Sequence, residues 1–250
     1  LGLEIASQLK QNGAAAIVLV SRSPDKFQSA LDRLNDEDAT PSSTAQRSNQ
    51  CIIKFIRADL SNANDASSII PRAIQLLSTS TSKSTTSTSP LPQPILISGI
   101  VNAAASTSRG NLLTTTPEMF DDQYTTNVRG PFLVTQGAAR HMMDYNNQLS
   151  LSRNNISDSS NSASGSMDGS DSSIIPRGLC SIVNICSVAA KGGAPFILPY
   201  SCAKSALVTL TKNNAAELAP HGIRVNGVNM GWCLTENEHA LQREVHGGGG

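Results

Sequence analysis

The sequence feature that most constrains the fold is the order of apolar runs between Ser181 and Val228. A first run, SIVNIC, is typical of a buried strand and ends at Ser187, and a second run, IRVNGV, begins at Ile223. Between them, apolar residues recur at helical spacing: Ala203, Ala206, Leu207, Leu210, Ala215 and Leu218. Helix start and stop signals flank this segment: Pro199, Pro220 and Gly222. A strand, a helix and a second strand therefore follow one another here.

Two residues of the predicted helix carry a specific chemistry. Tyr200 and Lys204 lie on one face of it, about one turn apart. A phenol has a reference pKa of about 10, and a neighbouring ammonium lowers that pKa by stabilising the phenolate, which makes a better general acid or base near neutral pH. The Ser187 hydroxyl, at the preceding strand end, could align a substrate oxygen with the phenol. For the bare Tyr–Lys spacing, a solvated surface pair is the competing interpretation.

The block around this pair closely resembles the active site of the short-chain dehydrogenase/reductase family. It has the family's serine, a twelve-residue gap, Tyr-x-x-x-Lys and then the run ELAPHGIRVN. The resemblance implies that Ser187 orients the substrate, that Tyr200 is the general acid or base, and that Lys204 lowers its pKa and binds the nicotinamide ribose. It also identifies Asn127, in Asn127-Val-Arg-Gly, with the helix asparagine that holds a water and the backbone near the lysine. A solvent-facing polar residue is the alternative for Asn127.

The beginning of the chain predicts a helix that feeds a strand. Apolar residues recur at helical spacing over residues 1–10, Asn12-Gly13 is a helix stop, and residues 14–20 form an apolar, β-branched run. This order is half of a βαβ nucleotide-binding unit. The resemblance implies that Leu1 and Gly2 match the end of the family's glycine-rich turn and contact the cofactor. The family's first strand and earlier glycines do not occur here, and both ends of the sequence look cut.

The residues after the second predicted strand bear on the choice of cofactor. In folds of this class, a carboxylate at that place hydrogen-bonds the ribose 2′-hydroxyl and repels a phosphate. This chain instead has Ser21 and Arg22, and a guanidinium can bind a 2′-phosphate through two parallel hydrogen bonds. The sequence therefore favours NADP(H), with a solvated arginine as the alternative for Arg22.

Other cofactor contacts follow from the resemblance. Asp59, followed by Leu60, matches the aspartate that caps the adenine pocket, although a turn or helix-capping aspartate is an equal alternative. Asn102 begins Asn-Ala-Ala-Ala where the family has Asn-Asn-Ala-Gly, so Ala105 adds a methyl group near the expected cofactor. Thr235 matches the threonine that contacts the nicotinamide carboxamide, and Trp232 would lie near the substrate mouth or in the core.

The remaining segments complete an alternating pattern of strands and helices. Further strands are predicted at 51–60 and 95–101, and helices at 23–36, 67–77 and 116–145, the last entered through Thr116 and Pro117. Three polar inserts have too little apolar content to fold and are predicted to be disordered: 37–50, 78–94 and 146–177.

Composition narrows the class of protein further. Nineteen basic and nineteen acidic residues cancel, so no polyanionic partner such as nucleic acid is indicated. No apolar run reaches the eighteen or so residues of a membrane span. The five cysteines form no C-x-x-C pair and no metal-ligand spacing with the four histidines, which favours reduced thiols, a cytoplasmic protein and no metal site. An organellar targeting peptide would precede Leu1 and stays open.

Together these features predict one α/β domain over residues 1–250, a doubly wound parallel sheet of Rossmann type with helices on both faces. The predicted activity is NADP(H)-dependent reduction of a small-molecule carbonyl, or oxidation of the alcohol, with Tyr200 as proton donor or acceptor. The resemblance implies a homo-oligomer. Two alternatives stay open: a catalytically silent nucleotide-binding protein with a regulatory role, and an epimerase or dehydratase that also uses a tyrosine and a lysine.

Overall fold

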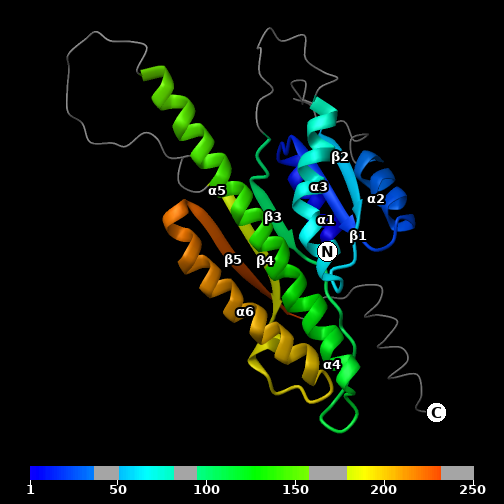
Figure 1. The fold of residues 1–250 in the computed structure, drawn as a ribbon. Helices are drawn as coiled ribbons and strands as arrows, with labels where there is room; N and C mark the ends of the chain where they lie inside the picture. The colour runs from blue at the N-terminus through cyan, green and yellow to red at the C-terminus, as the bar shows by residue number, and fades with distance from the viewer. Residues whose placement is uncertain (37–50, 82–94, 158–178, 232–250) are drawn as a thin grey trace.

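The computed structural model describes residues 1–36, 51–81, 95–157 and 179–231 (Figure 1). Strands and helices alternate along these residues. The strands are β1 (Ala16–Ser21), β2 (Ile52–Arg57), β3 (Gly99–Asn102), β4 (Cys180–Ser187) and β5 (Ile223–Met230). The α-helices are α1 (Gly2–Gln11), α2 (Asp25–Asp36), α3 (Ala63–Thr81), α4 (Pro117–Tyr124), α5 (Gly130–Ser157) and α6 (Leu198–Leu218).

All strand pairs are parallel, and they form two sheets within the described residues. β1 pairs with β2, while β4 lies between β3 and β5. Parallel pairing with a helix after each of the first four strands confirms the predicted doubly wound class. Within the described residues, β1 and β3 are not paired with each other, so the strands form two separate ladders.

Helices cover both faces of the strands, which gives three layers. On one face, Val18 and Ile56 pack with residues of α3 and α5, and the same core reaches Ile182 of β4 and Val225 of β5. Side chains of opposite parity in β1, such as Ile17, pack with α1 and α2 on the other face. The α3–α5 core therefore joins the two sheets, and Figure 1 shows α5 running past β3 and β4 while α3 lies beside β1 and β2.

Local signals placed most helix ends correctly. Asn12 is the C-cap of α1 and Gly13 has a φ of 85°, as a helix stop requires. Thr116 caps α4 by accepting a hydrogen bond from the Met119 amide at 3.3 Å, and Pro117 is the first helical residue. Gly222, after α6, is left-handed with a φ of 70°.

Several predicted boundaries were wrong. α3 runs from Ala63 to Thr81 instead of 67–77, so the first residues of the predicted 78–94 insert are helical. α5 continues to Ser157, so residues 146–157 are helical instead of disordered. β3 is shorter than the predicted 95–101 strand. In α5, helical hydrogen bonding simply propagates into a polar segment, which costs less than starting a new helix.

The predicted helix over 116–145 is interrupted once. A π-helical turn, Thr125–Arg129, separates α4 from α5, and the Gly130 amide donates to the Thr125 carbonyl. Such turns insert one residue into a helix and rotate the side chains that follow. Residues 37–50, 82–94 and 158–178, together with Trp232 and Thr235, lie outside the described residues, and the predictions for them stay predictions.

Candidate active site

The predicted catalytic residues come from the end of one strand and the start of one helix. Ser187 is the last residue of β4, and its Oγ accepts a hydrogen bond from the Ala189 amide at 3.1 Å, which caps the short turn Val188–Lys191. Tyr200 and Lys204 lie in the first two turns of α6, which packs on β4 and on that turn. The arrangement therefore places all three in one region of the fold.

Lys204 is held in place and away from water. It is 2% exposed, and its Nζ donates to the Ile185 carbonyl of β4 at 2.7 Å. The same Nζ lies 5.7 Å from the centroid of the Tyr200 ring. Burial lowers the pKa of Lys204 to about 8, and the nearby Cys186 opposes this shift. A buried ammonium beside a phenol favours the phenolate, because little water screens the attraction.

Asn127 faces inward, so the solvent-facing alternative is wrong. Its side chain is fully buried and lies in the π-helical turn between α4 and α5. The Oδ1 accepts from the Ser106 amide and the Nδ2 donates to the Ser106 carbonyl, both at 2.9 Å. Asn127 thus fastens the segment that follows β3 to the helix that packs against α6. A water relay from Asn127 to Lys204 stays a prediction.

The predicted cofactor residues gather at the carboxyl ends of the strands. Ser21 ends β1, Asp59 and Leu60 follow β2, and Asn102 ends β3. In parallel α/β sheets, ligands bind outside this edge. The start of α1 also lies there, because a Cβ on Gly2 would be 3.9 Å from the Ala103 Cβ. The structure thus brings residues from four segments to one edge.

Arg22 and Asp59 lie close enough to act on each other. Arg22 is exposed, and its charge is one of the causes that lower the pKa of Asp59. The larger cause is the Ser61 hydroxyl, which donates to Asp59 Oδ1 at 2.7 Å, while the Ser61 amide donates at 2.9 Å. The Asp59 carboxylate therefore caps a turn, which is the alternative that the sequence left open; contact with an adenine ring stays a prediction.

Leu60 and Gly130 form a close contact that holds the turn after β2 against α5. A Cβ on Gly130 would lie 2.9 Å from both the Cβ and the carbonyl oxygen of Leu60. Arg129, the preceding residue, donates from Nη2 to the Ser61 carbonyl. The long helix is therefore attached to the turns after two strands, through Arg129 and Gly130 on one side and Asn127 on the other.

Sequence reasoning missed a set of buried polar residues beneath the site. Asn102 is buried and donates to Asn184 Oδ1 at 2.8 Å, and Asn184 in turn donates to Thr211 Oγ1 at 2.9 Å. The signal was present: Asn184 interrupts an apolar strand, and Thr211 lies on the apolar face of α6, seven residues after Lys204. No local pattern, however, pairs a strand asparagine with a helix threonine.

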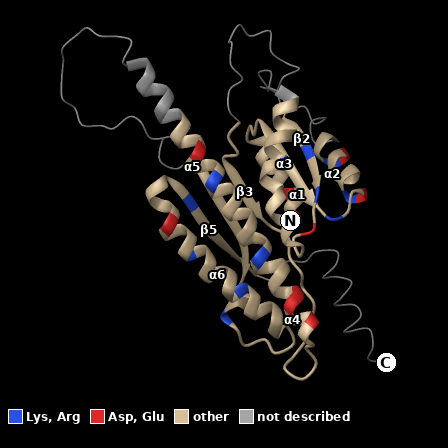
Figure 2. Cartoon of the chain, in the orientation of Figure 1, with Lys and Arg blue, Asp and Glu red and all other residues tan. Residues whose placement is uncertain are grey.

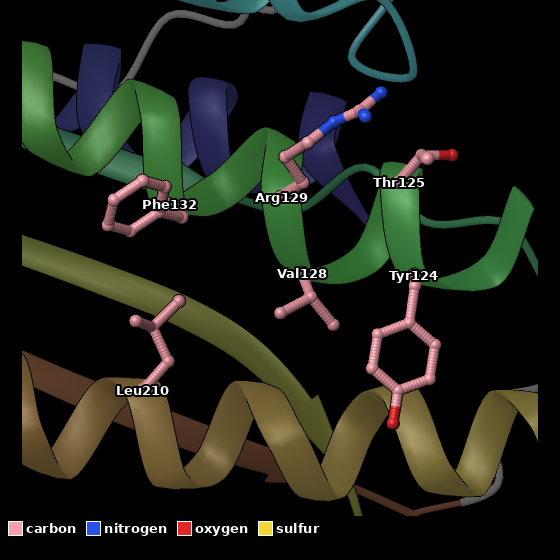
Figure 3. Close-up of a pocket in the computed structure, with 6 residues that line it drawn as sticks. All are labelled: Tyr124, Thr125, Val128, Arg129, Phe132 and Leu210. Atoms are coloured by element: carbon pink, nitrogen blue, oxygen red, sulfur yellow. The ribbon is translucent and has the colours of Figure 1, made fainter. Parts of the chain in front are cut away.

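An open groove of about 450 Å³ lies between the α4–α5 region and α6. Its lining residues are Tyr124, Thr125, Val128, Arg129, Phe132 and Leu210. Figure 3 shows Val128 and Leu210 pointing into the space between the helices, while Arg129 points away from it. Ser187, Tyr200 and Lys204 do not line this groove.

Charge and metal-ligand geometry add little to the site. Figure 2 shows basic and acidic residues interspersed along the described helices and strands, without a cluster of basic residues alone in this view. Over the same residues, no group of three His, Cys, Asp or Glu side chains is placed to hold a metal ion. None of the described helices has the length and apolar content needed to cross a membrane.

Two family models match this chain. The family model described as "KR domain" matches residues 1–152, and the model described as "short chain dehydrogenase" matches residues 172–246. Together they cover both the predicted cofactor segments and the block with Ser187, Tyr200 and Lys204.

Individual relatives match over part of their length. Gluconate 5-dehydrogenase of Gluconobacter oxydans is 32% identical over 57% of this chain and 43% of the relative, and carbonyl reductase [NADPH] 2 of Sus scrofa is 34% identical over 54% and 43%. The matches thus span less than half the length of these relatives. The crystal structure of NAD⁺-bound xylitol dehydrogenase superposes with a TM-score of 0.68 at 19% identity, covering 98% of this chain and 71% of that one, which shows a shared fold.

Proposed function

Because the chain belongs to the short-chain dehydrogenase/reductase family, we propose that the protein is an oxidoreductase that reduces a small-molecule carbonyl, or oxidises the alcohol, with Tyr200 as general acid or base. The observation that supports this most directly is the buried Lys204. Its Nζ is fixed on the Ile185 carbonyl at 2.7 Å, and its charge lies beside the Tyr200 ring. Because burying an ammonium is costly, a lysine at this buried position is consistent with a role for its charge beside the phenol.

The residues present fit a nicotinamide dinucleotide. The amino end of α1 lies beside the segment after β3, and backbone amides at a helix start favour an anionic group such as a pyrophosphate. Ala105, where the family has glycine, is exposed to solvent instead of packed in the core. When bound, the cofactor supplies or accepts the hydride, and the protein orients the reactants and moves the proton.

The proton step follows from three side chains. The Ser187 oxygen already accepts from the Ala189 amide, which leaves its O–H proton to donate to the substrate carbonyl oxygen. Tyr200 donates its phenolic proton to the same oxygen as negative charge develops there. Lys204 stabilises the phenolate that remains, and Asn127 holds the neighbouring backbone in place during reprotonation. Oxidation of an alcohol uses the same groups in reverse.

NADP(H) is proposed as the preferred cofactor. Arg22 is exposed directly after β1, where its guanidinium can meet a ribose 2′-phosphate. The names of the relatives include both an NADPH-dependent carbonyl reductase and an NAD⁺-bound xylitol dehydrogenase, so the preference rests on Arg22. By resemblance to the family we also propose a homo-oligomer, which sedimentation of the full-length protein would test.

The experiment that tests this function uses the purified full-length protein with a panel of ketones and aldehydes. Oxidation of NADPH should depend on the carbonyl, and Tyr200→Phe should lower kcat by orders of magnitude while NADPH affinity stays nearly constant, because only the hydroxyl is lost. Lys204→Met should lower both kcat and the affinity for NADPH. Cofactor binding without carbonyl-dependent turnover would instead support the catalytically silent alternative, and turnover by Tyr200→Phe within a few-fold of the parent would exclude the assigned role.

A further inference from the structure

A line of buried side-chain hydrogen bonds connects β3, β4 and α6. Asn102 donates to Asn184 Oδ1 at 2.8 Å, Asn184 Nδ2 donates to Thr211 Oγ1 at 2.9 Å, and the Thr211 hydroxyl donates to the Leu207 carbonyl at 2.7 Å. Asn184 is 0% exposed and Thr211 6% exposed. Both ends of the Asn184 amide are therefore used: the oxygen accepts and the nitrogen donates.

An asparagine at this place needs an explanation beyond packing. The neighbouring inward residues of β4, Ile182 and Cys186, are apolar and buried, and a leucine or valine at 184 would fill the same space. A buried polar side chain costs free energy unless it is fully paired, and it then favours one arrangement of its partners over all others. Asn184 thus specifies how β4 and α6 lie relative to each other.

The second attachment between these two elements is Lys204. Its Nζ bonds to the carbonyl of Ile185, the residue next to Asn184. Lys204 and Thr211 are seven residues apart, so they lie on one face of α6 about 10 Å from each other along its axis. Together with the apolar packing of α6 on the sheet, these two attachments to consecutive residues of β4 fix the helix at two points along its axis.

The sheet is shaped to let Thr211 reach Asn184. In the strand register, Asn184 is paired with Gly227 of β5. A Cβ on Gly227 would lie 3.4 Å from the Thr211 Cγ2 and 3.3 Å from the Cys186 Sγ. The bare backbone at Gly227 therefore allows α6 to approach the sheet at this point.

From this geometry we propose that Asn184 and Thr211 are positioning residues, which hold α6 in register on β4 and so keep Tyr200 and Lys204 aligned with Ser187. The inference rests on the proposed function for its catalytic consequence. Neither residue is assigned a contact with the substrate. They act through the helix, because a displacement of about 1 Å between the proton donor and the strand end that orients the substrate is enough to slow proton transfer strongly.

The test replaces the Thr211 hydroxyl in the full-length protein. Thr211→Val keeps the volume but removes the acceptor of Asn184, whereas Thr211→Ser keeps the hydroxyl. Thr211→Val should lower kcat about tenfold or more with KM for the ketone changed less than about threefold, and Thr211→Ser should restore kcat. A control for lost packing alone is Ile69→Val, a buried residue of α3 outside the line. It should lower Tm without changing kcat.

A second readout does not depend on turnover. The ¹³Cε resonance of Lys204, assigned by its loss in Lys204→Met, should titrate near the pKa of about 8 that burial produces. Cys186 on β4 and Tyr200 on α6 are the titratable groups on that side. Thr211→Val removes the Thr211 hydrogen bond that lowers the pKa of Cys186, and the resulting loss of thiolate would move the Lys204 midpoint downward, opposite to the shift expected from water entry. In Thr211→Val the loosened helix admits water, so the midpoint should move upward toward 10.5, while Thr211→Ser should leave it unchanged.

The outcomes separate the two hypotheses. If Tyr200→Phe abolishes turnover while Thr211→Val keeps both kcat and the Lys204 midpoint, the positioning role is wrong and the proposed function stands. If Tyr200→Phe remains active, the proposed function is wrong, and the Lys204 midpoint alone decides whether Thr211 holds the helix. If Thr211→Val does not fold, Thr211→Cys, which keeps a weak acceptor, is used instead. Its kcat should again fall and its Lys204 midpoint should again rise.

Discussion

The Asn127 side chain makes two hydrogen bonds with the backbone of Ser106: its Oδ1 accepts from the Ser106 amide and its Nδ2 donates to the Ser106 carbonyl, each at 2.9 Å. A side-chain amide can make this pair of bonds because it carries one acceptor and one donor group side by side. The contact joins residues 21 positions apart in the chain. It therefore turns the segment after β3 and the π-helical turn into one unit.

This contact predicts a stability loss for Asn127→Asp. A carboxylate can still accept from the Ser106 amide, but it faces the Ser106 carbonyl with a second acceptor and no donor. The free energy of unfolding should fall by about 1–3 kcal/mol at neutral pH, measured by urea denaturation. Asn213→Asp makes the same chemical change on an exposed position of α6 and should have little effect. Equal unfolding free energies for the two variants would contradict the prediction.

The close approach of α5 to the turn after β2 predicts that Gly130→Ala is destabilising. Alanine is normally the better helix former, by up to about 1 kcal/mol. Here, however, its methyl group would lie 2.9 Å from the Leu60 Cβ and carbonyl oxygen, where backbone must move. We expect a net loss of about 1–3 kcal/mol in the free energy of unfolding.

Gly99→Ala is the matched control for this change, because a Cβ at Gly99 meets no atom within 4 Å. Thermal and urea unfolding of both variants would be compared with the parent. If Gly130→Ala proves as stable as Gly99→Ala, the backbone around Leu60 can move to accommodate the methyl group without loss of stability, and the prediction is wrong.

The lowered pKa of Lys204 predicts a dependence of stability on alkaline pH. The folded pKa is about 8 and the ordinary value is 10.5, so between these pH values the unfolded chain binds more protons than the native protein. Stability contributed by this group therefore rises as pH increases through that window, by up to about 3 kcal/mol. Below about pH 8 the full cost of burying the ammonium remains.

Other groups also titrate in this range, so the parent is compared with Lys204→Met. The difference between their free energies of unfolding should move in favour of the parent from about pH 8 to about pH 10.5. Parallel curves for the two proteins across this window would mean that burial does not lower the lysine pKa.

The exposed Arg22 predicts a preference for NADPH over NADH that Arg22→Ala should remove. Loss of a charge-assisted phosphate contact should cost about 1.5–3 kcal/mol, so Arg22→Ala should weaken NADPH binding about tenfold or more and barely change NADH binding. Calorimetry on the full-length protein measures both. Lys26→Ala, which removes an exposed positive charge from the following helix, is the control. A parent protein that binds both cofactors equally would refute the assignment.

The sequence by itself determined the features that depend on neighbouring residues. Continuous β-branched runs predicted the parallel strands, and Thr116, Gly13 and Gly222 predicted helix ends, because caps and stops are local hydrogen-bond and φ requirements. The sequence pattern also sufficed to place Ser187 at a strand end and Tyr200 and Lys204 at a helix start, since one turn of helix sets the distance between the last two.

The tertiary structure alone decided the contacts between segments far apart in the chain. Only the packed fold shows that Asn127 faces Ser106, that Gly130 meets Leu60, and that Asn184 joins Asn102 to Thr211. Burial by remote elements, not local pattern, set these pairings. The same holds for Lys204, whose lowered pKa arises because β4 and α6 together exclude water from its ammonium group.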